Sequence, residues 1–306
     1  MESIPRVGLG TWKSPNTNEV TEAVRYAIEE AGYRHIDCAA IYMNEKAVGD
    51  AIKDVISRGV VKRSDLWITS KLWNADHAPE DVENACRKTI SDLQCDYLDL
   101  YLIHNPMAFR KGDCPSLEDV KKPYPTVDIP IVDTWKAMQP LVEKGLVRHI
   151  GVSNFTIELM EKLRYAEGVT IQPYANQVEC HLYMQQGALA QYLRSRGIML
   201  TAYSPLGSMD SGITKGVNIL KDPVLLEVAN ELNQTPAAVE LKFLLELSPN
   251  IQVIPKSVTK SRIKENNQLN FELSESQMQR LIKRERCTRF ANFYEFFGID
   301  VTGDHF

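Results

Sequence analysis

The sequence predicts an α/β protein in which eight parallel strands, most of them followed by a helix, close into a single (β/α)8 TIM barrel. Short β-branched runs alternate along the chain with segments of helical period. Several of these runs are almost wholly apolar, which is typical of parallel strands buried on both faces. Polar residues recur at the carboxyl ends of the strands along the whole chain. An open doubly wound sheet, the alternative, would gather them at one switch point, so we prefer the barrel.

The positions of the elements follow from apolar spacing and from capping residues. The eight expected strands are residues 7–10, 35–39, 66–71, 97–103, 149–153, 175–179, 198–204 and 252–257. Apolar residues at intervals of three and four predict helices that begin near residues 20, 47, 82, 131, 158 and 188. Later helix starts are expected at Asp222-Pro223 and Thr235-Pro236, with proline in the first turn, and at Ser274, which forms a capping-box pattern with Gln277.

The length and composition of the chain limit the kinds of protein that it can be. We expect the 306 residues to form one domain over residues 1–306, with 44% apolar and 25% charged residues as in ordinary soluble proteins. The net charge of -5 disfavours nucleic acid or an anionic membrane as a partner. No apolar run approaches the ~20 residues of a membrane span, and no signal peptide is visible. Six scattered cysteines indicate free thiols in a reducing compartment, so a cytoplasmic location is expected.

Two segments interrupt the alternation. Residues 105–130 form a long loop rich in proline, and residues 285–306 form a tail rich in phenylalanine. Long loops at the mouth of a barrel commonly shape a binding site, and the aromatic residues of the tail argue against a disordered terminus. Both segments are therefore expected to contribute to a substrate pocket at the carboxyl-terminal face.

Four polar residues lie at or just after the ends of three successive expected strands. Asp37 and Tyr42 follow the second strand, Lys71 ends the third and His104 follows the fourth. Each alone has an ordinary structural explanation, although an unpaired lysine at the end of an apolar strand would be costly to bury. In a barrel the four would converge on one rim.

Together these four residues form a coherent acid site. A neighbouring ammonium lowers the pKa of a tyrosine from its ordinary value of about 10, so that Tyr42 could deliver a proton to a developing alkoxide. Asp37 would hold Lys71 charged, and a neutral His104 could orient a carbonyl oxygen. Such a site has no nucleophile and needs a source of hydride.

The sequence does not support a Rossmann cofactor site, because GLGTWKS (8–14) carries only the first two glycines of the GxGxxG motif. Another segment indicates where a cofactor would bind. The segment IPKSVTKSRIKEN (254–266) places Lys256, Ser257 and Arg262 at a strand end and helix start, a natural phosphate site, although a solvated charged helix is equally consistent. SPLGS (204–208) could wrap a pyrophosphate. Ser153, Asn154 and Gln177 could bind a carboxamide.

At this point the sequence resembles the aldo-keto reductase superfamily, in particular its aldose reductase and xylose reductase branch. The resemblance is carried by GLGTWKS (8–14), GYRHIDCAAIY (32–42), TSKLW (69–73), DYLDLYLIH (96–104), GVSNF (151–155), NQVECH (176–181), TAYSPLGS (201–208) and IPKSVTKSRIKEN (254–266). It implies a barrel that reduces carbonyls by direct hydride transfer from NADPH, without metal.

The resemblance also implies roles for individual residues. Asp37, Tyr42, Lys71 and His104 match the family's catalytic tetrad, with Tyr42 as general acid. The implied cofactor-binding residues are Gly10, Thr11, Trp12, Ser153, Asn154, Gln177, Tyr203, Ser204, Leu206, Ser208, Lys256, Ser257, Val258, Thr259, Arg262, Glu265 and Asn266. Within that set Tyr203 would stack on the nicotinamide, and Lys256, Ser257, Arg262 and Asn266 would clamp the 2′-phosphate. The implied substrate-binding residues are Trp12, Ile41, Tyr42, Trp73, His104 and Asn105.

The chain departs from the branch at three places. LIHNPMAF (102–109) and the Arg289-Phe290 tail are more similar to xylose reductases, whereas the 2′-phosphate segment is similar to aldose reductases. Asn105 stands where aldose reductases usually carry tryptophan, and the hairpin that usually plugs the bottom of the barrel is largely missing. The alternatives for function are a ketosteroid or prostaglandin type of reductase and an NADPH-binding regulatory subunit. The partner expected is a small-molecule carbonyl, and the chain is expected as a monomer or weak homodimer. Glu179-Cys180-His181 is a poor metal site, because adjacent strand residues point to opposite faces.

Overall fold

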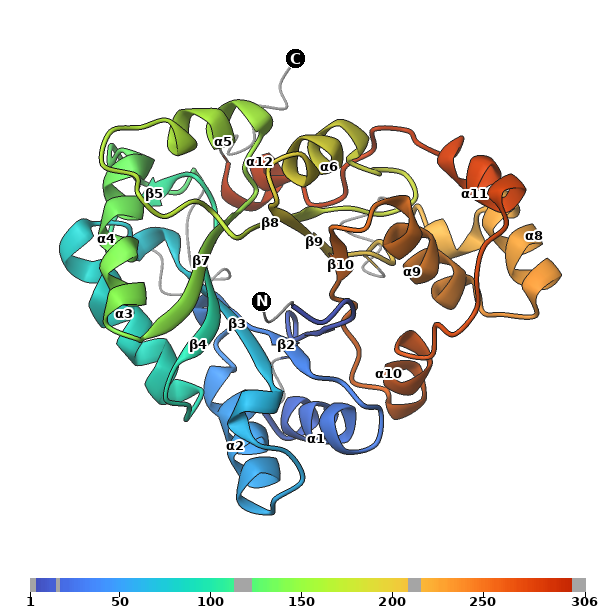
Figure 1. Cartoon of the computed structure of the whole chain (residues 1–306), viewed down its shortest axis with the longest axis horizontal. Helices are drawn as coiled ribbons and strands as arrows, with labels where there is room; N and C mark the ends of the chain where they lie inside the picture. Colours follow the sequence, from blue (N-terminus) through green and yellow to red (C-terminus); the bar gives the residue numbers. More distant parts are fainter. Residues whose placement is uncertain (1–3, 15–16, 113–122, 209–215, 299–306) are drawn as a thin grey trace.

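Eight parallel strands surround the centre of the molecule, and the helices form a ring outside them (Figure 1). The structure is a computed structural model, and it describes residues 4–14, 17–112, 123–208 and 216–298. The strands of the barrel are β1 (Leu9–Gly10), β2 (His35–Asp37), β3 (Trp67–Leu72), β4 (Leu98–Ile103), β7 (Val147–Ser153), β8 (Ala175–Glu179), β9 (Met199–Tyr203) and β10 (Ile251–Val253). They pair in this order, and each overlaps one of the eight strands expected from the sequence.

Backbone hydrogen bonds between the first and last strand segments close the barrel. The amide of Gly8 donates to the carbonyl of Val253 at 2.9 Å, and the amide of Gly10 donates to the carbonyl of Pro255 at 3.1 Å. A Cβ at Gly10 would lie 2.8 Å from the carbonyl oxygen of Ile254, so only glycine allows this close approach. The predicted closed barrel is confirmed.

The expected helices are present and begin within three residues of the expected positions, while α12 was not expected. They are α1 (Thr17–Glu29), α2 (Glu45–Ser57), α3 (Pro79–Asp92), α4 (Ile131–Glu143), α5 (Ile157–Arg164), α6 (Gly187–Arg194), α8 (Pro223–Leu232), α9 (Pro236–Leu247), α10 (Lys260–Asn266), α11 (Glu275–Ile282) and α12 (Phe293–Phe297). The side chain of Asp222 caps α8, Thr235 caps α9, and Ser274 forms the expected capping box with Gln277. These caps satisfy amides that would otherwise lack partners at the first turn.

The amino-terminal end of the barrel is filled by aromatic side chains. The ring of His149 lies 5.7 Å from that of Trp67 and 4.2 Å from that of Tyr174. Ile4, the first described residue, is buried in the same apolar cluster as Trp67. These side chains occupy the end where the family's hairpin was expected to be missing.

The two long segments lie partly within the described residues. In the first, β5 (Ala108–Phe109) pairs antiparallel with β6 (Thr126–Val127), while residues 113–122 lie outside the described part. In the tail, Phe290 is buried and α12 follows it, while residues 299–306 lie outside the described part. The expectation of an ordered aromatic tail therefore holds for residues 285–298.

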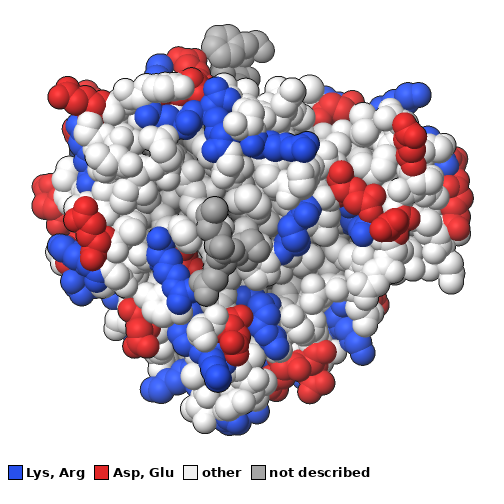
Figure 2. Space-filling view, viewed as in Figure 1, with Lys and Arg blue, Asp and Glu red and all other residues white. Residues whose placement is uncertain are grey.

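The surface carries charges of both signs. Figure 2 shows Lys, Arg, Asp and Glu interspersed over the face in view. Within the described residues no helix is long and apolar enough to cross a membrane. The five cysteines in the described part, Cys38, Cys86, Cys95, Cys180 and Cys287, are all free thiols, and Cys114 lies outside it.

Candidate active site

The four residues expected to carry the chemistry meet at the carboxyl-terminal end of the barrel. The ammonium of Lys71, in β3, donates to Asp37 Oδ2 at 2.7 Å, to the carbonyl of Cys38 at 2.7 Å and to the hydroxyl of Tyr42 at 3.3 Å. Tyr42 ends a short 3-10 turn after β2, and its ring lies edge-on to that of His104, 5.9 Å between centroids. The structure thus brings together the residues that the sequence placed on one rim.

The ion pair between Lys71 and Asp37 is almost completely shielded from water. The side chain of Lys71 is 1% exposed and that of Asp37 is 2% exposed. A buried pair is tolerated only when the remaining polar atoms also have partners. Here Asp37 Oδ1 accepts from Gln177 Nε2 at 2.7 Å, and Asp37 Oδ2 accepts from Lys71. Both carboxylate oxygens are satisfied, and the ammonium is held against Tyr42.

The protonation states follow from burial and from this pair. Burial raises the pKa of Tyr42 to about 12, and the Lys71 ammonium opposes that rise without reversing it. Lys71 lowers the pKa of Tyr42, as expected, but the effect of burial is larger. The expectation that this pKa would fall below its ordinary value is therefore wrong. Burial lowers the pKa of Lys71, but Asp37 and Tyr42 raise it above its ordinary value.

His104 is held neutral. Burial lowers the pKa of its imidazole well below the ordinary value, and the ammonium of Lys71 and the ring of His77 lower it further. A neutral imidazole carries one N–H, which can donate to a carbonyl oxygen. The site therefore combines a protonated phenol, a charged ammonium and a neutral imidazole, a set suited to protonating and orienting a carbonyl.

The expected cofactor residues lie on adjacent strand ends on the other side of the barrel. They lie in or after β7, β8, β9, β10 and β1, which are consecutive around the closed sheet. Ser153 Oγ donates to the carbonyl of Gln177 at 2.8 Å, and the hydroxyl of Tyr203 donates to Asn154 Oδ1 at 2.9 Å. Neutral amide and hydroxyl groups thus gather at the ends of β7, β8 and β9.

The segment after β9 turns sharply beside the tail. Ser204 and Gly207 have φ of 48° and 68°. A Cβ at Gly207 would lie 3.3 Å from the ring of Phe290, so this turn packs closely on the tail. Leu206 and Ser208 are half-buried, and residues 209–215, which come next, lie outside the described part.

The expected phosphate residues lie between β10 and α10. Lys256 Nζ donates to the carbonyl of Lys13, and Ser257 Oγ accepts from the amide of Thr259 at 3.1 Å. Arg262 and Glu265 are exposed on α10, Val258 is half-buried, and Asn266 is buried at the end of the helix. The bridge between Gly10 and Lys256 connects this region to the Thr11 and Trp12 loop after β1.

An apolar wall borders the acid site on the side of β3. It comprises Ile41, Trp73, Phe109, Tyr124 and Phe297, which form one buried cluster. The ring of Trp73 lies 5.4 Å from that of His104 and 6.2 Å from that of Phe297. Ile41, Trp73 and the aromatic tail were expected from the sequence. Phe109 and Tyr124 were not, although their aromatic character within the proline-rich loop was the available signal.

Asn105 follows His104 and is only 1% exposed. Its Nδ2 donates to Asn74 Oδ1 at 3.2 Å, and its Oδ1 accepts from Asn154 Nδ2 at 2.9 Å. The amide of Asn105 therefore faces the residues expected to bind a carboxamide.

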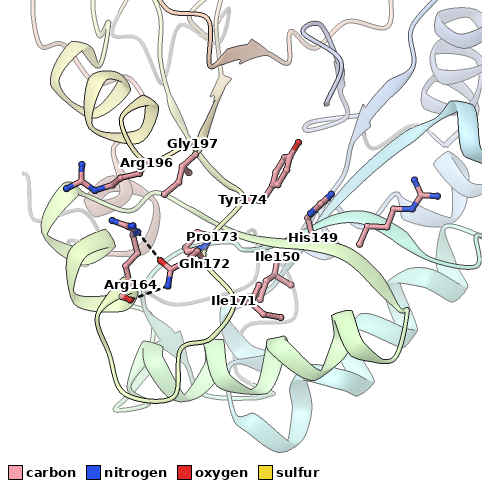
Figure 3. Close-up of a pocket in the computed structure, with 11 residues that line it drawn as sticks. His149, Ile150, Arg164, Ile171, Gln172, Pro173, Tyr174, Arg196 and Gly197 are labelled. Atoms are coloured by element: carbon pink, nitrogen blue, oxygen red, sulfur yellow. Dashed lines mark hydrogen bonds between the residues drawn. The ribbon is translucent and has the colours of Figure 1, made fainter. Parts of the chain in front are cut away.

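A separate cavity of about 260 Å³ lies at the opposite end of the barrel (Figure 3). Its lining residues precede or begin β7, β8 and β9, as Arg148, Tyr174 and Gly197 illustrate. Arg164 and Gln172 hydrogen-bond across one side of it. Active sites of such barrels lie at the carboxyl-terminal face, so this cavity is not the candidate active site.

Comparison with known proteins gives a consistent assignment. Residues 6–285 match the model of the aldo/keto reductase family. The chain is 45% identical to aldo-keto reductase family 1 member A1 of Gallus gallus over 284 residues, covering 90% of this chain and 84% of the relative. It is 42% identical to the Bos taurus protein of that name over 293 residues, covering 94% and 88%. The structure of the aldose reductase from Schistosoma japonicum superposes with a TM-score of 0.89 at 39% identity, covering 100% of this chain and 97% of that one.

A closed parallel barrel of this kind, matched over almost its whole length by reductases, defines an oxidoreductase of the (β/α)8 class. More particularly, the chain belongs to the aldo/keto reductase family. Members of this family reduce carbonyl groups with nicotinamide cofactors.

Proposed function

We propose that this chain is an NADPH-dependent reductase of aldehydes and ketones, in which Tyr42 is the proton donor. The observation that carries the proposal is the contact of Tyr42 with a Lys71 ammonium that Asp37 holds in place. We further propose that the chain acts in the cytoplasm as one barrel domain, as a monomer or weak homodimer, on a small-molecule carbonyl.

The residues present fit NADPH. Neutral hydrogen-bonding groups at Ser153, Asn154 and Gln177 suit an uncharged carboxamide, whereas the cations Lys256 and Arg262 suit a phosphate. The turn at Ser204–Ser208 lies between these two groups in the order of the strands. When bound, the nicotinamide supplies the hydride.

The chain's own residues donate the proton and orient the carbonyl group of the substrate. His104, held neutral, donates a hydrogen bond to the carbonyl oxygen and orients it. Tyr42 transfers its hydroxyl proton to that oxygen as negative charge develops there. Lys71 stabilises the phenolate that remains, and Asp37 keeps Lys71 charged and in place.

Two observations support the substrate class: the apolar wall beside the acid site and the similarity to an aldose reductase. Ile41, Trp73 and Phe297 place apolar surface beside the acid site, while Trp12 lies half-exposed in the loop after β1. Apolar walls exclude water and accept the carbon skeleton of a small aldehyde. The solved relative is an aldose reductase, which supports aldoses and other small carbonyls as substrates.

The test is an assay of NADPH oxidation with glyceraldehyde, xylose or an aromatic aldehyde. The reaction is monitored as the loss of the reduced-nicotinamide absorbance, and each assay is repeated with NADH. We expect turnover with NADPH on at least one of these carbonyls, at a higher kcat/KM than with NADH. NADPH binding without turnover on any of them would contradict the proposal and favour a regulatory binding subunit. A preference for a ketosteroid in competition with an aldose would favour the steroid class.

A further inference from the structure

A continuous chain of side-chain amides connects β3 to the candidate carboxamide site. Asn74, just after β3, accepts a hydrogen bond from Asn105 Nδ2 at 3.2 Å. Asn105 Oδ1 accepts from Asn154 Nδ2 at 2.9 Å, and Asn154 Oδ1 accepts from the Tyr203 hydroxyl at 2.9 Å. Both ends of the Asn105 amide are therefore used inside the protein, and its side chain is 1% exposed.

The side-chain amide of Asn154 is oriented by its neighbours: its Nδ2 donates to Asn105 Oδ1 at 2.9 Å, to the carbonyl of His104 at 3.0 Å and to Ser153 Oγ at 3.2 Å. Its backbone is left-handed, with φ of 65°, and it lies in the loop that follows β7. An asparagine amide carries donors at one end and an acceptor at the other, so its function depends on which end faces the ligand. Asn105 donates to Asn74 and so presents its oxygen to Asn154. That oxygen, together with the carbonyl of His104, holds Asn154 Nδ2 inward and leaves Asn154 Oδ1 beside Tyr203.

We propose that Asn105 is a positioning residue for the cofactor. It fixes the side-chain amide of Asn154, and through it the hydroxyl of Tyr203, in the orientation that receives the nicotinamide carboxamide and ring. The inference rests on the proposed function and deepens it at one site. It assigns Asn105 to the cofactor half of the site instead of the substrate pocket expected from the sequence.

The direct test compares two ligands that share one half. NADPH carries both the nicotinamide and the adenosine 2′-phosphate, whereas 2′,5′-ADP carries only the phosphorylated adenosine. In Asn105→Ala, the Kd for NADPH should rise about tenfold, the usual loss for one buried hydrogen bond. The Kd for 2′,5′-ADP should remain within about twofold of the wild-type value. Asn105→Ser provides the same comparison should the alanine variant fail to fold.

A double-mutant cycle tests whether Asn105 acts through Asn154. If it does, Asn105→Ala should change the Kd for NADPH by less than about twofold in an Asn154→Ala background. Independent effects that multiply in the double variant would overturn the inference.

Two other outcomes would also overturn it. Equal weakening of NADPH and 2′,5′-ADP by both Asn105 variants would indicate general damage to the barrel. A change in KM for the carbonyl with an unchanged Kd for NADPH would return Asn105 to the substrate pocket. Failure of the proposed function is distinguishable, because the wild-type chain would then show no NADPH oxidation with any carbonyl, whatever the Asn105 variants do to the two Kd values.

Discussion

The proposed role of Tyr42 depends on the charge of Lys71, and the charge of Lys71 depends on Asp37. Burial raises the pKa of Tyr42 to about 12 even though a neighbouring ammonium lowers it, so the phenolate would be costlier still without that charge. Lys71 supplies that charge, and it stays charged while buried because Asp37 pairs with it. Removing one partner of such a buried pair leaves an unpaired charge and costs about 3–5 kcal/mol. The proposed acid role of Tyr42 therefore depends on the buried pair of Lys71 and Asp37.

Arg262 is the residue through which we expect the chain to distinguish NADPH from NADH. It is exposed on α10, beside the expected phosphate residues Lys256 and Ser257. Arg262→Ala should raise the Kd for NADPH about tenfold to a hundredfold, because hydrogen bonds to charged groups are worth about 1.5–3 kcal/mol. The Kd for NADH, which lacks the 2′-phosphate, should change little. Fluorescence titration with both nucleotides measures the two values.

Lys264→Ala is the matched control, because it removes a positive charge from the same exposed helix two residues away. That variant should bind NADPH nearly as well as the wild-type chain. Equal weakening of NADPH and NADH by Arg262→Ala would remove Arg262 from the phosphate site.

At the scale of elements, one carboxylate anchors the tail to the barrel. Glu179 ends β8, is fully buried, and accepts from the amides of Phe290 at 2.7 Å and Ala291 at 3.0 Å. The ring of Phe290 also stacks on His181, whose Nε2 lies 2.9 Å from Glu179 Oε1. This anchor fixes the segment that carries Phe297 into the apolar wall.

Glu179→Gln should loosen that segment, because an amide cannot accept all three of these hydrogen bonds. Amide hydrogen exchange at Phe290 and Ala291 should become at least about tenfold faster, and KM for apolar carbonyls should rise. The control is Glu275→Gln at the exposed start of α11, which should leave exchange in the tail unchanged. Unchanged protection at Phe290 in the Glu179 variant would contradict the anchor.

Glu240, on α9, makes the stability of the barrel depend on pH. Its Oε1 accepts from the amide of Leu182 at 2.7 Å, and its Oε2 has no partner among the described residues. Burial raises its pKa from 4.5 to about 8, and Asp222 adds to that rise. The folded chain therefore binds this proton more tightly than the unfolded chain. The stabilisation is complete below the unfolded pKa and is lost as pH rises through about 8.

Glu240→Gln keeps an acceptor for Leu182 and cannot ionise. Relative to the wild-type chain, its free energy of unfolding should increase from pH 4.5 to about pH 8, by an amount on the order of a few kcal/mol. Urea unfolding of both chains at several pH values measures the difference at each pH, so that other titrating groups cancel. A difference that does not vary with pH would contradict the account of Glu240.

At the scale of the whole molecule, the barrel divides the chemistry between two arcs of strands. The acid residues lie in or after β2, β3 and β4, whereas the expected cofactor residues lie in or after β7 to β10 and β1. The two arcs connect through Asp37, which contacts Lys71 on one side and Gln177 on the other. Because β2, β3 and β4 are neighbours in the sheet, the order of the strands along the sequence was enough to predict that the acid residues lie together.

What the sequence could not predict depends on contacts between distant segments. The residue types of the acid site were clear, but the rise in the pKa of Tyr42 required the burial that only the folded barrel supplies. Asn105 looked like a pocket residue because it follows His104, and its amide network with Asn74 and Asn154 joins three separate strand ends. Glu179 looked like part of a poor metal motif, and its partners lie more than a hundred residues later.

The central claim is that Tyr42 donates the proton in a reaction that uses NADPH. The most direct test is Tyr42→Phe, assayed for NADPH oxidation with glyceraldehyde and titrated with NADPH. Tyr192→Phe, which removes a hydroxyl from α6 away from the strand ends, is the control and should keep full turnover. We predict that Tyr42→Phe lowers kcat at least about 100-fold while its Kd for NADPH stays near the wild-type value. Substantial turnover in Tyr42→Phe would contradict the account.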